Sequence, residues 1–559
     1  MEQFVVRNLQ QTAFVADAKN DAHAMNVKVG SPKEISAIFD SISYSKAGSV
    51  IRMISHALTE STFKKGLSSY LNAMKNKAAE PTNLFDELVK VATGVTSLPK
   101  ALQLWATQPG YPVLTVTVND TKQILYVTQE RFLSKKPDKP PTEKWSIPIN
   151  YVTQKGLDFS DTKPHTWLNH ETAKTTITGV DMKANQWVIF NKKQTGYYRV
   201  NYDKANWERI GSYLRSKEYE KIDPINRAQI LDDSFNLAHA GYLDYQVFLD
   251  ISKYLEQEVD YVPWHAAFRA FYALKRVLTN TSKYEPFRLY MLKLTETLVK
   301  NVTYTETENE EHIMKFNRNN ALDWVCSMGS EECKTTAHKK LTNHLLGTKI
   351  SPDLRGVMLC GGLRTANEST WANTFNLFLT SKNAVERAAI LKGLGCSSDS
   401  TILKSYLAKI IETKSKVPLE NALKAVSGGS PAGIDIAFDF VNDNYKAIVA
   451  IDNKTEKIVS CLNDIASRMT TQTQLEKLKK FIDATPDIAK ELNEKGLVEA
   501  TLNVEWLTKH EKVFETFFNE QKLVPSTENK DNSSPRIRLP TLSLTIFLVL
   551  VARFASFIR

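Results

Sequence analysis

The segment Gln108-Pro109-Gly110-Tyr111-Pro112-Val113-Leu114-Thr115-Val116-Thr117-Val118 separates two kinds of sequence pattern in this chain of 559 residues. Before the segment, apolar residues recur every three or four positions, which is typical of amphipathic helices. After its prolines and glycine, apolar residues alternate with threonines over residues 114–118 at a period of two, which predicts a half-buried strand. The segment therefore marks a boundary between a helical region and a β-rich region.

Residues 1–97, before this boundary, have the pattern of consecutive helices. Ser31-Pro32-Lys33-Glu34 has the form of a capping box with proline at the first helical position. Apolar residues then follow at helical spacing, with Ile35, Ile38, Phe39 and Ile42 in one stripe and Val50, Ile51, Ile54 and Leu58 in the next. These stripes predict amphipathic helices that each bury one face.

Two further regions follow the boundary. Strand-like segments at residues 124–127, 145–152, 187–190 and 197–202 are broken by Pro, Asn and Gly, which predicts a small β-sandwich within residues 98–203. Over residues 204–524 helical spacing returns, and many helices joined by short turns predict an α-solenoid of HEAT or armadillo type. No fixed period is visible, so the repeats are expected to be irregular. The expected fold class is multidomain and mostly α.

The overall composition is that of a globular protein, with 42% hydrophobic and 10% aromatic residues. The formal net charge of +10 could indicate an anionic partner. The basic residues are scattered among acidic ones, however, and the densest group, the lysines within residues 135–144, lies among prolines as in a solvated loop. Nucleic acid is therefore not an expected partner.

The C-terminal residues have the order of a glycosylphosphatidylinositol attachment signal. The small residues Asn532-Ser533-Ser534 precede a polar spacer through Thr541 and an apolar run over residues 542–552. The alternative is a weak transmembrane helix, but Arg553 ends the run well short of the roughly 20 apolar residues that a span requires. We therefore interpret residues 525–559 as a linker and lipid-anchor signal with Asn532 as the attachment site, which predicts a protein on the extracellular face of the plasma membrane.

The N-terminal residues do not match that destination. No basic region followed by an apolar region, as in a signal peptide, comes after Met1, so the natural amino terminus is expected to lie upstream. Sequons that would permit N-glycosylation in the secretory pathway occur at Asn119, Asn280, Asn301, Asn367, Asn453 and Asn532.

The five cysteines are compatible with an oxidising compartment. They are Cys326, Cys333, Cys360, Cys396 and Cys461. Two disulfides and one buried thiol are expected for this number of cysteines. Spacing alone does not assign the pairs.

The residue types that carry common chemistry form no complete motif. His170-Glu171 and His510-Glu511 lack a second histidine at the spacing that places two imidazoles on one helix face. The sequence contains no zinc-ribbon cysteines, phosphate-binding glycine loop or nucleophile elbow. One stretch, residues 42–53, stands out because small and polar residues surround Tyr44 at the start of a helix. The ordinary interpretation of such a tyrosine is a packed core residue with a satisfied hydroxyl.

Residues 42–53 nevertheless resemble the tyrosine-bearing helix of the aminopeptidase N family of zinc metallopeptidases, whose pattern is Ser-Tyr-Ser-Lys-Gly-Ala-Ser-Val. The order Ala47-Gly48 is swapped here, and Tyr44 stays in register. Further segments resemble the same family in the same order, at residues 104–112, 196–203 with Trp207, 226–233 and 261–264. The resemblance covers residues 1 to about 525. The layout of the whole chain is similar to that of lipid-anchored members of this family found in insect gut.

The resemblance implies both a fold and a set of site residues. Residues 1–97 would be the helical end of a thermolysin-like catalytic domain, and the disulfides would be Cys326–Cys333 and Cys360–Cys396. The family holds zinc with H-E-x-x-H and a downstream Glu, and it binds the substrate's free amine with Gly-x-Met-Glu-Asn. None of these occurs in residues 1–559, so no metal is expected to bind to this chain. Only Tyr44 carries over, and its hydroxyl would donate a hydrogen bond to the oxyanion of the tetrahedral intermediate.

These expectations combine into one functional hypothesis. The chain is expected to be the C-terminal part of a cell-surface zinc aminopeptidase that releases amino-terminal residues from peptides, and to be inactive alone. One alternative is a non-catalytic surface protein that binds peptides or a toxin-like partner on the helical region. Another is assembly with a separately encoded amino-terminal half. An exposed apolar surface is expected near residues 1–30. Neither substrate preference nor oligomeric state follows from these residues.

Overall fold

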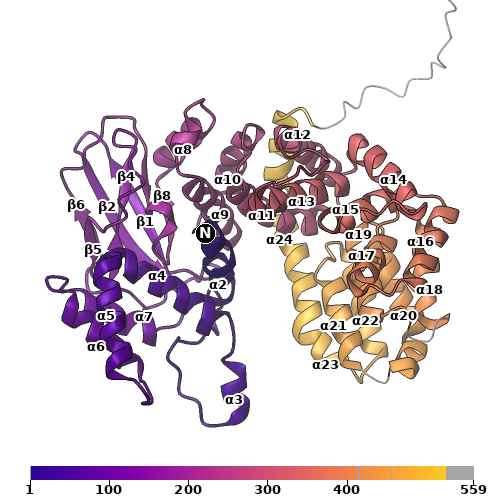
Figure 1. Ribbon diagram of the computed structural model, residues 1–559, viewed down its shortest axis with the longest axis horizontal. Helices are drawn as coiled ribbons and strands as arrows, with labels where there is room; N and C mark the ends of the chain where they lie inside the picture. The colour runs from indigo at the N-terminus through magenta and orange to yellow at the C-terminus, as the bar shows by residue number, and fades with distance from the viewer. Residues whose placement is uncertain (1, 413–415, 453–454, 524–559) are drawn as a thin grey trace, which may run out of the picture. The chain divides into compact units, whose positions relative to one another are not determined.

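Helices form most of the chain on either side of a short β-rich region (Figure 1). The computed structural model describes residues 2–412, 416–452 and 455–523. The mostly helical class predicted from the sequence is confirmed. Asn453, Asn532 and the interpreted linker and anchor signal of residues 525–559 lie outside the described residues. Within the described ranges, no helix combines the length and apolar character needed to cross a bilayer.

The N-terminal helices begin as the sequence predicts, but one of them ends early. Ser31 caps α3 by accepting a hydrogen bond from the Glu34 N–H. The helix ends at Ala37, and of the predicted stripe over residues 35–42 only Ile42 is buried. The elements are α1 (Glu2–Val5), η1 (Val6–Gln10), α2 (Gln11–Asp17), α3 (Pro32–Ala37), η2 (Ile42–Lys46), α4 (Ala47–Leu58), α5 (Glu60–Ala73), α6 (Pro81–Val91) and α7 (Leu98–Thr107).

The β-rich region contains one mixed sheet and two short ladders. Strands β1 (Pro112–Asn119), β2 (Ile124–Arg131), β6 (Thr175–Ile177) and β8 (Arg199–Tyr202) form a sheet in the order β6-β2-β1-β8. β1 and β2 form an antiparallel hairpin, whereas β8 runs parallel to β1. β3 (Ile147–Ile149) pairs with β5 (Thr166–Leu168), and β4 (Tyr151–Thr153) pairs with β7 (Val188–Phe190).

The predicted period of two in β1 is confirmed, because Leu114 and Val116 are buried and Thr117 is exposed. The strand predicted over residues 145–152 is instead divided into β3 and β4 at Asn150. The buried Asn150 side chain donates to the Thr162 carbonyl at 2.7 Å and accepts from the Lys192 N–H at 2.8 Å. These side-chain bonds replace a regular ladder at that position.

Helices fill the rest of the described chain. They are α8 (Lys204–Leu214), η4 (Tyr219–Lys221), α9 (Pro224–Ala240), α10 (Tyr245–Ser252), η5 (Lys253–Glu256), α11 (Tyr261–Leu278), α12 (Tyr284–Val302), α13 (His312–Ser327), α14 (Glu331–Leu345), α15 (Pro352–Leu363), α16 (Glu368–Thr380), α17 (Ala384–Leu394), α18 (Ser400–Glu412), α19 (Leu419–Gly429), α20 (Gly433–Asp452), α21 (Thr455–Ala466), α22 (Gln472–Ala484), α23 (Ala489–Glu491), η6 (Leu492–Leu497) and α24 (Val498–Glu520). Alternate helices contact each other, with α13 against α15, α15 against α17, and α17 against α19.

Two hydrophobic cores stabilise these elements. The first core joins the N-terminal helices, the β-rich region and the helices up to α13, and the large side chains Trp105, Tyr111, Tyr197 and Trp264 are fully buried in it. The second core lies within residues 304–500. The last helix, α24, returns to the first core, where Phe517 packs edge-on against Tyr290 with ring centroids 5.2 Å apart.

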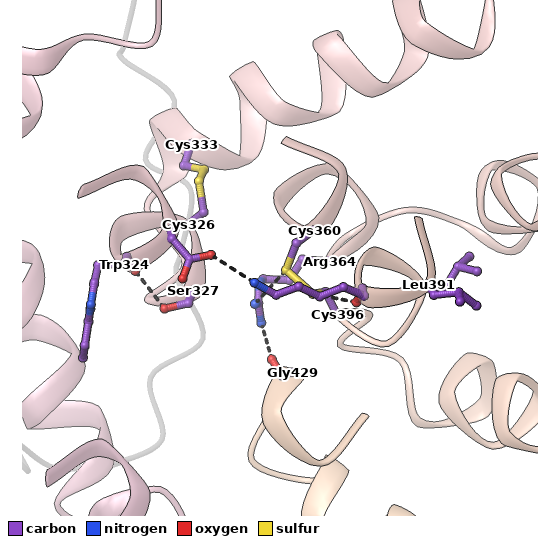
Figure 2. Close-up of a disulfide and its surroundings, with 12 residues drawn as sticks. Trp324, Cys326, Ser327, Cys333, Cys360, Arg364, Leu391, Cys396 and Gly429 are labelled. Carbon is purple, nitrogen blue, oxygen red and sulfur yellow. Dashed lines mark hydrogen bonds and ion pairs between the residues drawn. A yellow bond between two sulfur atoms is a disulfide. The ribbon is translucent and has the colours of Figure 1, made fainter. Parts of the chain in front are cut away.

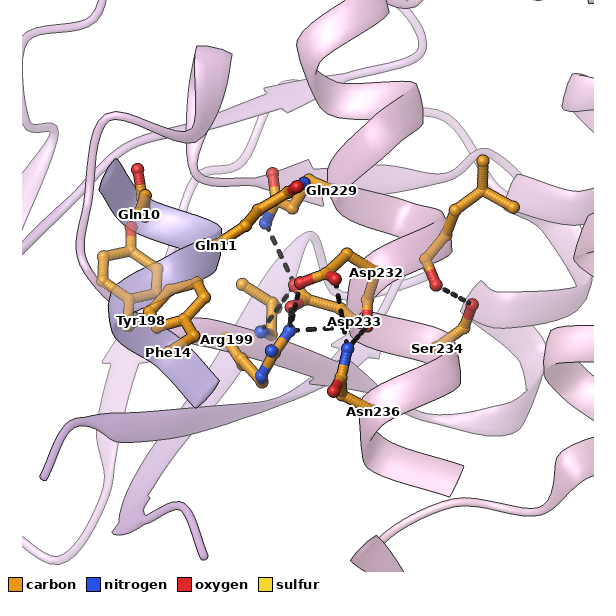
Figure 3. A network of polar contacts seen from close by, with 12 residues as sticks. Gln10, Gln11, Phe14, Tyr198, Arg199, Gln229, Asp232, Asp233, Ser234 and Asn236 are labelled. Atoms are coloured by element: carbon orange, nitrogen blue, oxygen red, sulfur yellow. Dashed lines mark hydrogen bonds and ion pairs between the residues drawn. The ribbon is translucent and has the colours of Figure 1, made fainter. Parts of the chain in front are cut away.

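A buried ion network connects the end of the β-rich region to α9 (Figure 3). Arg199 in β8 lies 2.7 Å from an oxygen of Asp232 and 2.8 Å from one of Asp233, and none of the three residues is more than 5% exposed. Burial raises the pKa of Asp233 to about 7, and the Asp232 carboxylate acts in the same direction. The network brings together the segments 196–203 and 226–233, which lie far apart in the sequence.

Candidate functional site

Tyr44 lies on η2, directly before α4, and its side chain faces outward. The residue is 61% exposed, and its ring lies beside that of Phe39 with centroids 6.2 Å apart. Among the described residues, no hydrogen bond to the Tyr44 hydroxyl is formed. A packed core tyrosine with a satisfied hydroxyl is therefore not what the structure contains. The phenol is free to donate to another group.

Asp40 holds the backbone of the Tyr44 turn. One carboxylate oxygen accepts from the N–H groups of Ile42 and Ser43 at 2.9 and 3.0 Å. The other oxygen lies 2.9 Å from Nε2 of His23. Although burial opposes the shift, the hydrogen bonds from Ser43 and His23 hold the pKa of Asp40 below its ordinary value. Asp40 is therefore ionised near neutral pH, as a carboxylate that caps a helical turn should be.

Lys46 anchors the other side of the same turn in the protein interior. Its Nζ atom lies 2.9 Å from Oδ2 of Asp17, and both side chains are fully buried. The same ammonium donates to the Gly110 carbonyl at 2.8 Å, and the Gly110 N–H donates to Oδ1 of Asp17 at 2.9 Å. Burial lowers the pKa of Lys46, and the attraction of Asp17 offsets part of that effect. The Tyr44 turn is thus tied to the boundary segment of residues 108–118.

Gly110 is required at this junction for two reasons. Its φ angle is +81°, a backbone conformation that residues with a side chain rarely adopt, and a Cβ atom there would lie 2.3 Å from Nε of Arg131.

Gly48, on α4, faces Leu9 of η1, whose Cδ1 atom would lie 3.3 Å from an added Cβ. The swapped order Ala47-Gly48 therefore places the smaller residue where η1 approaches α4.

The inner face of α4 contacts the loop between β7 and β8. The Arg52 guanidinium donates to the carbonyls of Gln194 and Lys193 at 2.7 and 3.2 Å. Both loop residues have positive φ angles, as does Asn191, whose amide side chain bonds to the Gly196 N–H and C=O. Tyr44 therefore projects from a helix start that is fixed on three sides, by Asp40, by Lys46 and by Arg52.

The residues near Tyr44 do not form a zinc site. Within the described parts of the chain, no group of three His, Cys, Asp or Glu side chains is placed to hold a metal ion. His23 and Asp40, a histidine and a carboxylate near Tyr44, are paired with each other within the protein. A catalytic zinc site needs three protein ligands, so the donors present here do not fit the zinc that the family implies, and no step through zinc is derived.

The supporting residues were only partly visible in the sequence. Tyr44 and Lys46 belong to the motif that was recognised, and Asp40 carries a weak signal because an Asp two residues before Ile42 is placed to cap a turn. Asp17 lies 29 residues before Lys46, and no local pattern indicates that they pair. His23 likewise lies 17 residues before its partner Asp40, and no local pattern indicates that they pair.

The structure contains both disulfides that the resemblance implied. Cys326 at the end of α13 is bonded to Cys333 in α14, and Cys360 in α15 is bonded to Cys396, which follows α17 (Figure 2). The Cα atoms are 5.3 Å apart in each pair, within the usual range for a disulfide. Cys461 is a free, buried thiol.

The sequon asparagines differ in how accessible their amides are. Asn301 and Asn367 are exposed, and Asn119 is half-buried. The Asn280 Nδ2 atom, to which a glycan would have to be attached, is buried without a hydrogen-bond partner among the described residues. Asn453 lies outside the described residues.

Exposed apolar residues occur on both sides of Tyr44 in the sequence and extend further along the chain than residues 1–30. In this part of the protein, the large exposed hydrophobic residues are Val15, Val29, Ile35, Phe39, Tyr44 and Ile51. Phe39 is the most exposed of them, at 67%. Exposed apolar residues are therefore found in the predicted region and also on α3 and α4.

Comparisons with known proteins place the chain in a family. Residues 187–505 match the model of the ERAP1-like C-terminal domain, and residues 1–105 match the model of the peptidase family M1 domain. Aminopeptidase N of Plutella xylostella is 34% identical over 86% of this chain and 52% of its own length. Aminopeptidase N of Rattus norvegicus is 29% identical over 93% of this chain and 55% of its own length.

A second insect relative gives the same result. Membrane alanyl aminopeptidase of Manduca sexta is 28% identical over 91% of this chain and 52% of its own length. The chain thus spans about half the length of the relatives that it matches. These matches, together with the outward-facing Tyr44 in its motif, show that the chain belongs to the aminopeptidase N family of M1 peptidases.

Proposed function

We propose that this chain is the C-terminal part of a cell-surface zinc aminopeptidase that releases amino-terminal residues from peptides. The observation that carries the proposal is the exposed Tyr44, whose hydroxyl has no hydrogen-bond partner among the described residues, on a turn held by Asp40 and Lys46. The relatives reported above are all named as aminopeptidases, which gives the non-catalytic alternative no support. The zinc ligands and the glutamate that acts with them would come from residues that this chain does not contain.

In this proposal Tyr44 supplies one hydrogen bond to the oxyanion that develops at the scissile carbonyl. A phenol is suited to this role because it donates a proton in a hydrogen bond without losing it near neutral pH. The fixed turn matters, since a donor stabilises a transition state most when it needs no rearrangement. Asp40, Lys46 and Arg52 act as positioning residues for the turn.

The rest of the proposed layout follows the expected domains. Residues 1–97 would complete the catalytic domain, residues 98–203 would form a β-sandwich, and residues 204–524 would form a helical solenoid. The mixed sheet with its two ladders, and the contacts between alternate helices, support these assignments. The exposed apolar residues around Tyr44 would pack against the remainder of the catalytic domain.

We also propose that the protein is anchored on the outer face of the plasma membrane. The name of the Manduca relative, a membrane aminopeptidase, supports a membrane location. Attachment of a lipid anchor at Asn532 is tested by treating intact cells with phosphatidylinositol-specific phospholipase C. Release of the protein is expected, and retention would contradict the anchor.

The first activity test uses the chain as it stands. Purified residues 1–559 are expected to bind no stoichiometric zinc and to leave an amino-acid naphthylamide uncleaved. Stoichiometric zinc together with hydrolysis would refute this part of the proposal.

The second test supplies the missing residues. The matching C-terminal part of the Plutella enzyme is replaced by this chain, and hydrolysis of an amino-acid naphthylamide is measured. Tyr44→Phe in this chimera is expected to lower kcat by about 10²–10³ with KM nearly unchanged, because one oxyanion donor is lost. Tyr70→Phe, on α5, is the matched control and should leave kcat unchanged. A zinc-loaded, folded chimera whose Tyr44→Phe variant is as active as its parent would contradict the role of Tyr44.

A further inference from the structure

A cavity of about 540 Å³ lies among the helices that follow the β-rich region, far along the sequence from Tyr44. Its walls come from α11, α13, α15, α17 and α19 and from the residues that follow α21. The disulfide Cys360–Cys396 forms part of the wall, and Arg364 extends beside it (Figure 2). A smaller cavity of about 40 Å³ adjoins it and shares Lys275 and Arg468 with it. We call the two together the basic cavity.

The charged side chains that line the larger part are mostly cationic. Five are basic, whereas only Asp323 and Glu420 are acidic, and the basic ones are Lys275, Arg364, Lys392, Lys424 and Arg468. Two of the five have carboxylate partners, since Lys392 lies 3.9 Å from Asp323 and Arg468 lies 3.3 Å from Asp464. The cavity therefore carries an excess of positive charge.

Lys275 and Arg364 have no carboxylate within ion-pair distance among the residues that the structure describes. The hydrogen bond found for the Lys275 ammonium in the described chain goes to the Ser327 hydroxyl at 3.4 Å, and the ammonium also lies 5.8 Å from the centroid of the Trp324 ring. The Arg364 guanidinium donates to the Gly429 carbonyl at 2.8 Å, and its Nε atom is buried without a partner (Figure 2). Burial, together with Arg364 and other nearby cations, lowers the pKa of Lys275 to about 8.

Neutral donors in the basic cavity are also left unpaired. Ser427 is 2% exposed and lines the smaller part, and its hydroxyl has no hydrogen-bond partner in the described chain. Ser430 lines the same part, and its hydroxyl is likewise buried and unpaired. Buried polar groups are almost always hydrogen-bonded, so several unpaired donors around one cavity are available to an acceptor that enters it.

We propose that the basic cavity is a binding site for a small organic anion that carries a carboxylate, sulfate or phosphate group. The anionic oxygens would lie where the two parts meet, with Lys275 and Arg468 lining both, Arg364 on one side and the Ser427 hydroxyl on the other. A cavity of about 540 Å³ has room for the rest of such a molecule, because ligand pockets typically span about 300–1,000 Å³. Trp324 and Tyr272 supply apolar wall for it.

Calorimetric titration of the full chain with inorganic sulfate, inorganic phosphate and citrate, at constant ionic strength and pH 7, tests this site. Binding of at least one anion is expected. Lys275→Met and Arg364→Met should each weaken that binding by about tenfold or more, because each removes a charge-assisted hydrogen bond. Lys293→Met, which removes a lysine paired with Glu256 outside the cavity, is the matched control and should bind like the parent. Tighter binding of citrate would identify a carboxylate ligand, and tighter binding of sulfate or phosphate a tetrahedral one.

A second measurement needs no variant and so does not depend on variant folding. At pH 8, with its pKa at about 8, Lys275 should react readily with an acylating reagent, and the bound anion should slow this reaction at least about fivefold. Acylation of Lys293, followed in the same digest, should be unaffected. Absence of heat with all three anions, absence of protection at Lys275, or equal binding by the two cavity variants and the parent would overturn the proposal.

Discussion

Lys46, which is fully buried, and Lys275 on α11, which is half-buried, differ in what surrounds them. Lys46 has a carboxylate and two carbonyl groups as partners, all from the protein itself. Among the described residues, Lys275 has the Ser327 hydroxyl, the Trp324 ring at 5.8 Å and several neighbouring cations, with Asp323 as a nearby anion. Because a charge away from water is costly unless it is paired, Lys46 is satisfied within the fold, whereas Lys275 is left available to the proposed anion. Four changes test this difference, beginning with the largest expected effect.

Lys46→Met is expected to lower the free energy of unfolding by about 3–5 kcal/mol, because it leaves Asp17 buried without a cation. The measurement is urea unfolding of the parent and the variant at pH 7. The double variant Lys46→Met with Asp17→Leu should recover much of the loss, since neither charge then remains buried. A single variant as stable as the parent would mean that the pair does not fix the Tyr44 turn.

His265 also lies among cations, but unlike the two lysines it is neutral in the folded protein at neutral pH. Burial, together with Arg7 and Arg269, lowers the pKa of His265 to about 4. The unfolded chain therefore binds more protons than the folded chain between about pH 4 and 6.5, and stability should fall as the pH is lowered through this window, by about 3 kcal/mol in total. Unfolding of His265→Gln across this range should show a weaker pH dependence, attributable to this residue. The same slope in parent and variant would contradict the assignment.

Features that depend on neighbouring residues could be predicted from the sequence, whereas contacts between distant segments could not. The alternation in β1 and the cap at Ser31 were predicted correctly because each depends on neighbouring residues. Tyr44 was found because its motif is contiguous. The break of the predicted strand at Asn150 depends on partners at Thr162 and Lys192, which no local pattern reveals.

The basic cavity could not have been predicted from local sequence patterns. Lys275, Arg364 and Arg468 come from different helices or their ends, and each alone has the sequence context of an ordinary surface cation. Their meeting follows from the arrangement of α11, α15 and α21, which lie far apart in the sequence. A net charge of +10 spread over the sequence gave no sign of this concentration.

Lys275→Met is expected to have a smaller effect than Lys46→Met and the opposite sign. The folded pKa of about 8 lies below that of an unfolded lysine, so the folded charge is unfavourable below pH 8 and the penalty disappears as the pH rises toward 10.5. The variant should therefore be more stable than the parent at pH 7, by about 1 kcal/mol, with a smaller gain at pH 9.5. Unfolding in urea at the two pH values measures this change. A loss comparable to that of Lys46→Met would show that Lys275 is part of the structural framework.

Tyr44→Phe should have the smallest effect on stability, within about 0.5 kcal/mol, because the residue is exposed and its hydroxyl bonds to no described residue. The same change is expected to slow the chimeric enzyme by about 10²–10³. The contrast between these two readouts separates a functional hydroxyl from a structural one, since a structural role would reduce stability and activity together. If Tyr44→Phe instead destabilised the chain by several kcal/mol, loss of activity in the chimera would no longer identify Tyr44 as the donor, and the turn held by Asp40 and Lys46 would have to be assigned a purely structural role.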